Sequence, residues 1–274
     1  MNFNKKKVAT LIVAFVMVWV GNVYWFKYNS LKEPLFIKSY ADLQSGMPIR
    51  LHYLQNINDE YGAVIITFPE ANKEFVQFNE YEWGRTRYYK MKEINIHFDN
   101  VEDVKRLTKG KEVKLTKANV QFGNGKSVVV NIGEVYLSPS VNETPLLQFN
   151  SGSQDSNYGG RTTTVAMSNG VIKGIKDRFS LKISDMVKLQ LNDKVVTPSE
   201  FPVKFKIGDT ITFQYDFKFK DENDIRSNYF YQLSRLIECE DLNGRQANEI
   251  VDLHYDPNIH EIDVKRLEKE EGNR

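Results

Sequence analysis

Cysteine is almost absent from this 274-residue chain, whose one cysteine is Cys239. A single thiol permits no internal disulfide, so the chain is no disulfide-stapled domain, and no cysteine near the N-terminus is available for lipid attachment. Cys239 alternates with Ile237 and Leu233 along what we predict to be the buried face of a strand. A thiol in that position packs as a small apolar group and does not act as a nucleophile.

An excess of charge of either sign is also lacking, since 37 basic side chains stand against 36 acidic ones. Three of the lysines lie in the first 26 residues, which leaves 34 basic against 36 acidic side chains in the remainder. This balance argues against a nucleic-acid partner, which requires a basic face, and against a polybasic membrane patch. No Gly-x-Ser-x-Gly elbow and no phosphate-binding glycine loop occurs, so we expect no cofactor and no nucleophilic catalysis.

A long uncharged run, residues 8–26, is present at the N-terminus. As a helix it would reach roughly 28 Å, close to the thickness of the hydrocarbon core of a bilayer. Tyr24, Trp25 and Phe26 end it, and these bulky side chains are typical of an aromatic belt and do not fit a signal-peptidase site. The sequence therefore predicts a transmembrane signal anchor. The alternatives are a buried helix of a soluble protein, or a cleaved signal with its site after Ala41.

Three lysines, at positions 5, 6 and 7, precede the run, and few basic residues follow it closely. The positive-inside tendency then leaves residues 1–7 in the cytoplasm and places the C-terminal domain outside. We expect a single-pass protein of the cell membrane. The many Lys, Asn, Ile and Tyr residues favour a bacterial cell envelope.

The remaining sequence is typical of strands. Ile211, Phe213, Tyr215 and Phe217 alternate with polar residues, which is the period of a strand buried on one face. Asn124-Gly125 predicts a hairpin turn. Further strand candidates are the runs 48–54, 62–68, 75–81, 87–98, 118–137, 179–183, 187–191, 203–207, 228–239 and 248–255. We predict an all-β ectodomain of the antiparallel β-sandwich type, with one helix at 99–110 that Asn100 caps.

The predicted domain order is a cytoplasmic tail (1–7), the anchor (8–26), a stalk (27–45) and a first β-domain (46–149). A linker or long loop (150–161) follows, because this stretch is rich in Ser and Gly and lacks aliphatic side chains. A second β-domain (162–274) ends in a charged C-terminal tail. A single larger sandwich is the alternative, in which 150–161 is a surface loop.

Two groups of side chains are candidates for metal binding or hydrolysis. His254 and His260 would lie opposite each other on strands that flank a turn at 256–258, which contains Asp256. No third ligand has a recognisable spacing, so we expect no metal there. Paired carboxylates can catalyse hydrolysis when they lie about 5 to 10 Å apart. The candidate pairs that lie close in sequence are Glu80 with Glu82, Asp221 with Glu222, and Glu238 with Glu240.

The segment 79–90 is the predicted ligand-binding surface. Trp83, the one tryptophan outside the anchor, lies beside Gly84, which suggests a bulge or a turn that places the neighbouring side chains at an edge or tip. Aromatic faces stack on sugar rings, and arginines bind carboxylate or phosphate, so the composition suits an anionic polymer or a protein partner. The residues that we expect to bind are Trp83, Arg85, Arg87, Tyr88 and Tyr89. Alternatively, these rings only pack a strand pair.

These observations predict a non-catalytic binding or interaction protein at the cell envelope, with an envelope polymer or a protein as its partner. A cell-envelope hydrolase that uses scattered carboxylates is one alternative. An accessory subunit of a membrane complex is another, in which the transmembrane helix itself takes part in association.

Overall fold

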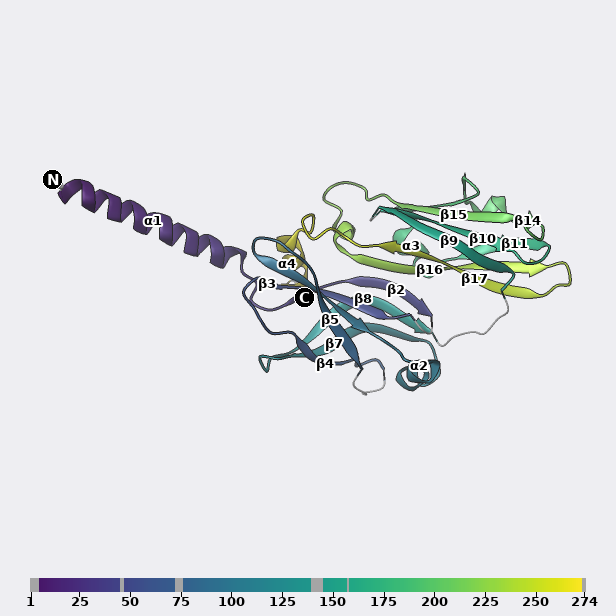
Figure 1. Cartoon of the computed structure of the whole chain (residues 1–274), viewed down its shortest axis with the longest axis horizontal. Helices are drawn as coiled ribbons and strands as arrows, with labels where there is room; N and C mark the ends of the chain where they lie inside the picture. Colours follow the sequence, from purple (N-terminus) through teal and green to yellow (C-terminus); the bar gives the residue numbers. More distant parts are fainter. Residues whose placement is uncertain (1–4, 45–46, 72–75, 139–144, 157, 273–274) are drawn as a thin grey trace.

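A computed structural model describes residues 5–44, 47–71, 76–138, 145–156 and 158–272. Helix α1 (Lys5–Asn29) projects from one end of an elongated β-body (Figure 1). Its segment Val8–Asn29 is long and apolar enough to span a membrane, with a mean hydropathy of 1.9, and none of it is buried. The helix is therefore no core helix of this fold. The predicted span, residues 8–26, lies within this helix.

The β-body begins almost directly after α1. Strands β1 (Leu35–Ile37) and β2 (Ser39–Gln44) are buried, so the predicted stalk at 27–45 is wrong for these residues. The charged residues Lys38 and Asp42 made this segment read as exposed in the sequence. In the structure Lys38 pairs with Glu270 and Asp42 pairs with Arg178, and both partners are remote in sequence. The segment between helix and body is short, and it is held at both ends.

The N-terminal half is a sandwich of strands with one helix. A four-stranded sheet, in the order β1-β3-β6-β5, packs against β2, β8, β7 and β4 around an apolar core that includes Leu43, Tyr53 and Phe122. Its further elements are β3 (Ile49–Asn56), β4 (Ala63–Thr67), β5 (Phe78–Arg85), β6 (Tyr89–Ile96), α2 (Val101–Thr108), β7 (Val113–Phe122) and β8 (Ser127–Ser138).

The C-terminal half is a second sandwich. A five-stranded sheet, in the order β13-β12-β15-β10-β9, packs against β14, β11, β16 and β17 around a core that includes Phe213, Tyr231 and Leu253. Its elements are β9 (Leu147–Ser156), β10 (Gly159–Ala166), β11 (Gly170–Lys176), α3 (Ser180–Ile183), β12 (Val187–Leu191), β13 (Lys194–Val195), β14 (Val203–Phe205), β15 (Thr210–Phe217), β16 (Phe230–Asp241), β17 (Gln246–Tyr255) and α4 (Val264–Gly272). The chain is an all-β sandwich protein with an N-terminal apolar helix, as predicted.

One strand joins the two halves. The start of β16 pairs in parallel with β2, and β2 pairs in parallel with β8, so a single eight-stranded sheet runs through both sandwiches. Strand β2 is buried along most of its length, which is the pattern of a central strand with parallel neighbours. The C-terminal core also includes Ile37 of β1, Leu54 of β3 and Met91 of β6, so the two halves share buried apolar contacts. The division into two domains stays a prediction.

Several local predictions have clear outcomes. Helix α2 has the predicted cap, because Asn100 and Asp103 form a capping box. Asn124 and Gly125 lie in the hairpin between β7 and β8, where Gly125 has a φ of 84°. The expected linker at 150–161 is wrong, since most of it lies in β9 and β10, which pair with each other. The run 179–183, predicted as a strand, contains the short helix α3.

The predicted charged C-terminal tail is wrong for residues 264–272, which form helix α4. Leu267 of α4 is buried, and Glu270 accepts hydrogen bonds from Lys38 and from Tyr229 at its Oε2, the latter at 2.6 Å. Figure 1 shows α4 beside the base of α1. The end of the chain therefore returns to the end of the body from which the helix projects.

Candidate functional site

Trp83 lies on β5, the edge strand of the four-stranded sheet. The β5–β6 register shifts between Glu82 and Gly84, so the predicted bulge at Gly84 is present. A Cβ on Gly84 would lie 3.3 Å from Ile259, which explains why a residue without a side chain fits there. The indole of Trp83 is 38% exposed, and its other face rests against the body.

The rings beneath Trp83 come from both halves. His52 of β3 stacks flat on Phe230 of β16, with ring centroids 3.5 Å apart and planes 3° from parallel. The Trp83 ring meets both of these rings edge-on, at centroid distances of 5.8 Å. Edge-to-face contacts of this kind hold an aromatic ring in one orientation. The indole is thus fixed on a rigid base while it presents a free face.

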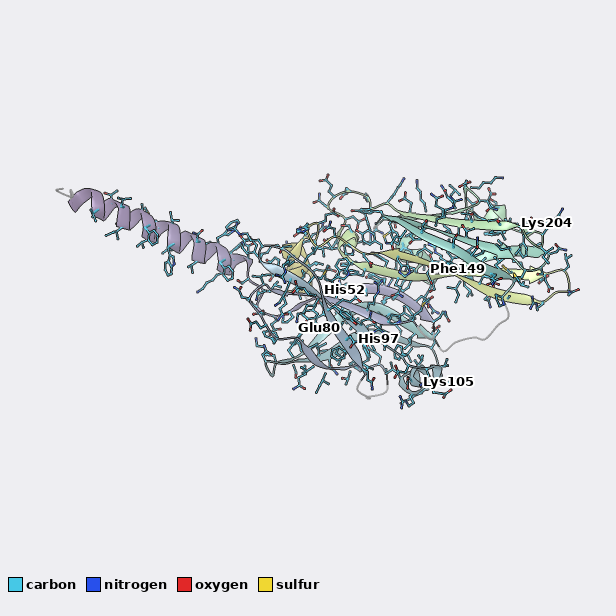
Figure 2. The ribbon with its side chains drawn as sticks, in the orientation of Figure 1. His52, Glu80, His97, Lys105, Phe149 and Lys204 are labelled. Carbon is cyan, nitrogen blue, oxygen red and sulfur yellow. The ribbon has the colours of Figure 1, made fainter. Side chains whose placement is uncertain are left out.

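Polar groups surround this aromatic stack. His52 Nε2 lies 3.2 Å from Glu93 Oε2, and Arg50 Nη2 lies 3.6 Å from Asp256 Oδ1. We call Arg50, His52, Glu93, Phe230 and Asp256 the seam, because they join the two halves. Figure 2 shows His52 where the halves meet.

Burial determines the protonation state of the seam histidine. His52 is 1% exposed, and desolvation lowers the pKa of its imidazole below 6.5, although the Glu93 carboxylate acts in the opposite direction. The neutral ring therefore donates from Nε2 to Glu93, and His52 Nδ1 has no hydrogen-bonding partner among the described residues. At neutral pH His52 is therefore an uncharged ring packed within the seam, beside the Glu93 carboxylate.

The other predicted binding residues do not form one surface. Arg85 is exposed beside Trp83 and pairs with Glu82 at 2.6 Å. Arg87 lies over the ring of Tyr88, and the Tyr88 hydroxyl accepts a hydrogen bond of 2.7 Å from Trp25 of α1. Tyr89 is buried in the C-terminal core. The structure thus leaves Trp83 and Arg85 exposed on β5, assigns Tyr88 to the attachment of α1, and makes Tyr89 a packing residue.

The three metal candidates are separated in the structure. His254 lies on β17, where burial lowers the pKa of its imidazole, while Asp256 faces Arg50 in the seam and His260 lies in a turn. No strand follows Asp256, so the expected hairpin is wrong. Within the described residues no group of three His, Cys, Asp or Glu side chains is placed to hold a metal ion.

Five of the six carboxylates of the suggested acidic pairs have a partner among the described residues. Glu80 accepts from Tyr53 and pairs with Lys92 at 2.7 Å, and Glu82 pairs with Arg85. Glu238 pairs with Lys176 and Glu240 with Lys173, while Asp221 accepts from a backbone N–H in its own turn. Cys239 is buried, which raises the pKa of its thiol to about 12 and agrees with a packing role.

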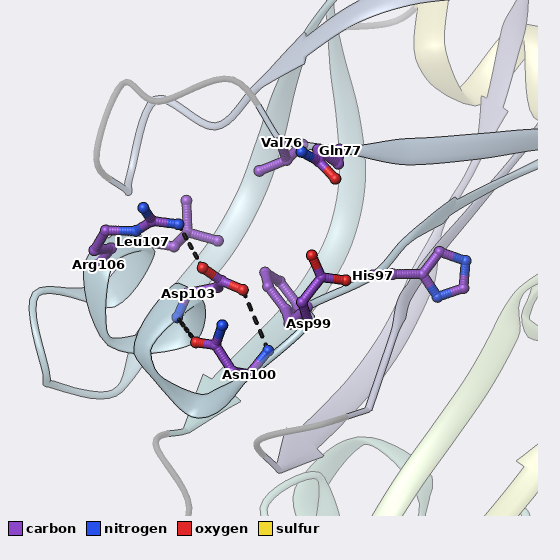
Figure 3. Close-up of a pocket in the computed structure, with 9 residues that line it drawn as sticks. Val76, Gln77, His97, Asp99, Asn100, Asp103, Arg106 and Leu107 are labelled. Carbon is purple, nitrogen blue, oxygen red and sulfur yellow. Dashed lines mark hydrogen bonds and ion pairs between the residues drawn. The ribbon is translucent and has the colours of Figure 1, made fainter.

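A cavity of about 230 Å³ lies between α2 and the end of β6 (Figure 3). Asp103 at its wall is held by the capping box and by an ion pair with Arg106. The imidazole of His97 points away from the carboxylate of Asp103. Asn100, Asp103 and Arg106 are therefore engaged with one another at the start of α2.

Sequence reasoning identified Trp83 but not its supports. His52 stands within an apolar run and Phe230 lies far away in sequence, so neither carried a signal of contact with Trp83. A polar residue inside a strand buried on both faces was the available clue, because such a residue must find a partner.

Comparisons with known proteins add little to this geometry. No protein-family model and no curated protein matches the chain. Among solved structures, it is similar to the Clostridium thermocellum CbhA fibronectin(III)-like modules, at 10% identity over 82% of this chain and 95% of that chain, with a TM-score of 0.23. A marsupial T cell receptor matches at 10% identity over 80% and 95%, with a TM-score of 0.25. The titin domains z1z2 in complex with telethonin match at 8% identity over 84% and 99%, with a TM-score of 0.21. Scores this low carry no argument about function, and the β-sandwich architecture rests on the strands described above.

Proposed function

We propose that this chain is a membrane-anchored, non-catalytic binding protein of the cell envelope whose contact surface is the outer face of β5. The observation that carries the proposal is Trp83, which is 38% exposed while its ring packs edge-on against two buried rings. A ring held in this way loses little conformational entropy when a ligand covers it. Tyr81, 51% exposed on the same strand, extends the surface, and the exposed guanidinium of Arg85 lies two residues beyond Trp83 along β5.

The attachment of α1 supports a site close to the membrane. Trp25 donates to Tyr88, and the Asn56 side chain forms two hydrogen bonds with the backbone of Leu31, of 2.7 and 2.9 Å. Trp83 is five residues from Tyr88, so at about 3.3 Å per strand residue it lies within roughly 16 Å of that contact. With α1 in a bilayer, the β5 surface would meet ligands near the outer membrane face.

The chemistry of the surface suits two kinds of ligand. An anionic envelope polymer would stack sugar rings on Trp83 and Tyr81 and offer acidic groups to Arg85. A protein partner would bury the same residue types as anchors, and the edge of β5 offers backbone groups to an extended segment.

Binding of the full chain in nanodiscs to purified envelope polymer, and to envelope proteins captured by crosslinking, tests the proposal. We expect Trp83→Ala and Arg85→Ala to weaken binding tenfold or more while the fold is kept, because each removes an anchor of the surface. Lys188→Ala, an exposed residue of β12 in the other half, is the matched control. Unchanged binding by folded Trp83→Ala protein to both kinds of material would refute the proposal.

The orientation is tested separately. Protease added to spheroplasts should degrade the chain from residue 30 onward, and the mature protein should keep lysines 5 to 7. A mature N-terminus at Asp42 would mean cleavage within β2 and would refute the anchor.

A role as an accessory subunit of a membrane complex is a second candidate, and the Trp25–Tyr88 hydrogen bond favours it. This contact couples the outer end of α1 to the β5–β6 hairpin, so a partner of the helix could also reach the β5 surface. Replacing residues 8–22 by an unrelated span would abolish co-purification of a partner that binds α1. Retained co-purification would leave the β5 surface as the point of contact.

A further inference from the structure

A larger cavity lies in the C-terminal half, between its two sheets. It measures about 530 Å³, and β11, β12 and β16 contribute to its lining together with the segment that follows β13. Apolar side chains form much of the wall, namely Ile175, Val187, Leu189, Val196 and Phe201. The volume is in the range of small-molecule sites, with room for roughly eighteen non-hydrogen atoms at about 30 Å³ each.

One cation lies at the inner wall of this apolar cavity. Arg235 occupies a position of β16 between Leu233 and Ile237, which are both buried in the core, and its own side chain is 12% exposed. An arginine on the inner face of a sandwich is costly unless its charge is paired and its five N–H groups are bonded.

The pairing of Arg235 is incomplete. Its Nη2 lies 2.7 Å from Asp177 Oδ2, and the Asp177 side chain is 8% exposed. Yet Arg235 Nε and Asp177 Oδ2 both lack a hydrogen-bonding partner among the described residues, so the charges are close while the donors are not aligned on the acceptor. Burial lowers the pKa of the guanidinium, although Asp177 opposes this. The guanidinium thus retains capacity for a further acceptor.

We propose that the cavity beside Arg235 binds a small amphipathic carboxylate, with its apolar body against Val187, Leu189 and Phe201 and its carboxylate on the guanidinium. A carboxylate matches the fork of an arginine and supplies acceptors for the guanidinium N–H groups that Asp177 leaves unbonded. Lys173 at the rim pairs with Glu240, so Arg235 is the cation that the ligand meets at depth. The site is independent of the β5 surface, which belongs to the other sandwich.

The probe is 4-phenylbutyrate, compared with its neutral isostere 4-phenylbutan-1-ol, titrated by calorimetry into the full chain in nanodiscs of zwitterionic lipid. Empty nanodiscs correct for partition into the bilayer. We expect saturable binding of the carboxylate at least tenfold tighter than that of the alcohol. Arg235→Met should remove this preference, and Arg161→Met, which changes an exposed arginine of β10, should not.

A second variant keeps the test decisive if Arg235→Met does not fold. Thr197→Trp places a large ring at the exposed rim of the cavity without touching Arg235, and it should abolish binding of the carboxylate. Equal binding of acid and alcohol, no saturable binding of either, or unchanged affinity in Thr197→Trp protein would overturn the proposal. Failure of the β5 surface to bind its ligand would leave this result unaffected.

Discussion

The ion pair between Asp177 and Arg235 allows a quantitative prediction about stability. Both side chains are nearly buried, at 8% and 12% exposure. Removing one partner of a buried pair leaves an uncompensated charge, which costs about 3 to 5 kcal/mol. The cavity beside Arg235 admits water, so the lower end of this range applies. Asp177→Asn should therefore reduce the free energy of unfolding by about 3 kcal/mol.

The choice of asparagine isolates the charge. Asp177 Oδ1 also accepts a hydrogen bond of 2.9 Å from the backbone N–H of Phe179, and the amide oxygen of asparagine can keep it. Adding Arg235→Met removes the second charge, so the double variant should recover at least about 2 kcal/mol of the loss, because apolar replacement of a buried pair is often neutral or stabilising. The coupling between the two sites is the quantity of interest.

Urea denaturation of the full chain in nanodiscs, followed by near-ultraviolet circular dichroism, measures these differences. With a slope of about 3 kcal/mol per molar urea, the midpoint of Asp177→Asn should fall by about 1 M. A loss below about 1 kcal/mol, or a double variant less stable than Asp177→Asn, would refute the reasoning. Asp193→Asn, which changes an exposed turn residue, is the control.

Three further predictions concern acid sensitivity, strand packing and the attachment of α1. Burial lowers the pKa of His52 and of His254, so near pH 6.5 the unfolded chain binds protons that the folded chain does not bind. Stability should hold above pH 7 and fall as the pH drops below 6.5, and His254→Leu should flatten part of this slope in urea titrations at several pH values. Gly133→Ala should cost at least about 2 kcal/mol, measured as a lower melting temperature, because Gly133 has a φ of 89° and an added Cβ would collide with the backbone of Ser39. Asn56→Ala should cost about 1 to 3 kcal/mol through two lost hydrogen bonds, and limited proteolysis between α1 and β1 should become faster.

The Gly133 and Asn56 predictions each have a matched control variant. Gly174→Ala is expected to be mild, since its Cβ would meet Glu238 at 3.6 Å, an ordinary contact. Asn79→Ala, an exposed residue of β5, should leave the cleavage rate unchanged. Constant stability from pH 7.5 to 5.5 would contradict the assignment of the two histidines as neutral. Equal proteolysis of the Asn56→Ala and Asn79→Ala proteins would mean that Asn56 does not hold the base of α1.

The sequence alone determined the features that depend on neighbouring residues. The apolar run of α1, the alternation in β15, the hairpin at Gly125 and the capping box of α2 are all encoded within a few residues of one another. The bulge at Gly84 is local as well. Periodicity and turn chemistry act over short distances along the chain, so a single sequence is enough to predict them.

The tertiary structure alone decided which polar and weakly patterned segments are buried. Residues 35–44 resembled a stalk because the partners of Lys38 and Asp42 lie far along the chain. Strand β9 resembled a linker because backbone bonds to β10, and not apolar side chains, hold it. The support of Trp83 by His52 and Phe230, and the cavity beside Arg235, likewise join residues remote in sequence. Such contacts form only when the sheets pack, since no local pattern specifies which distant side chain will satisfy a buried charge or cover a ring.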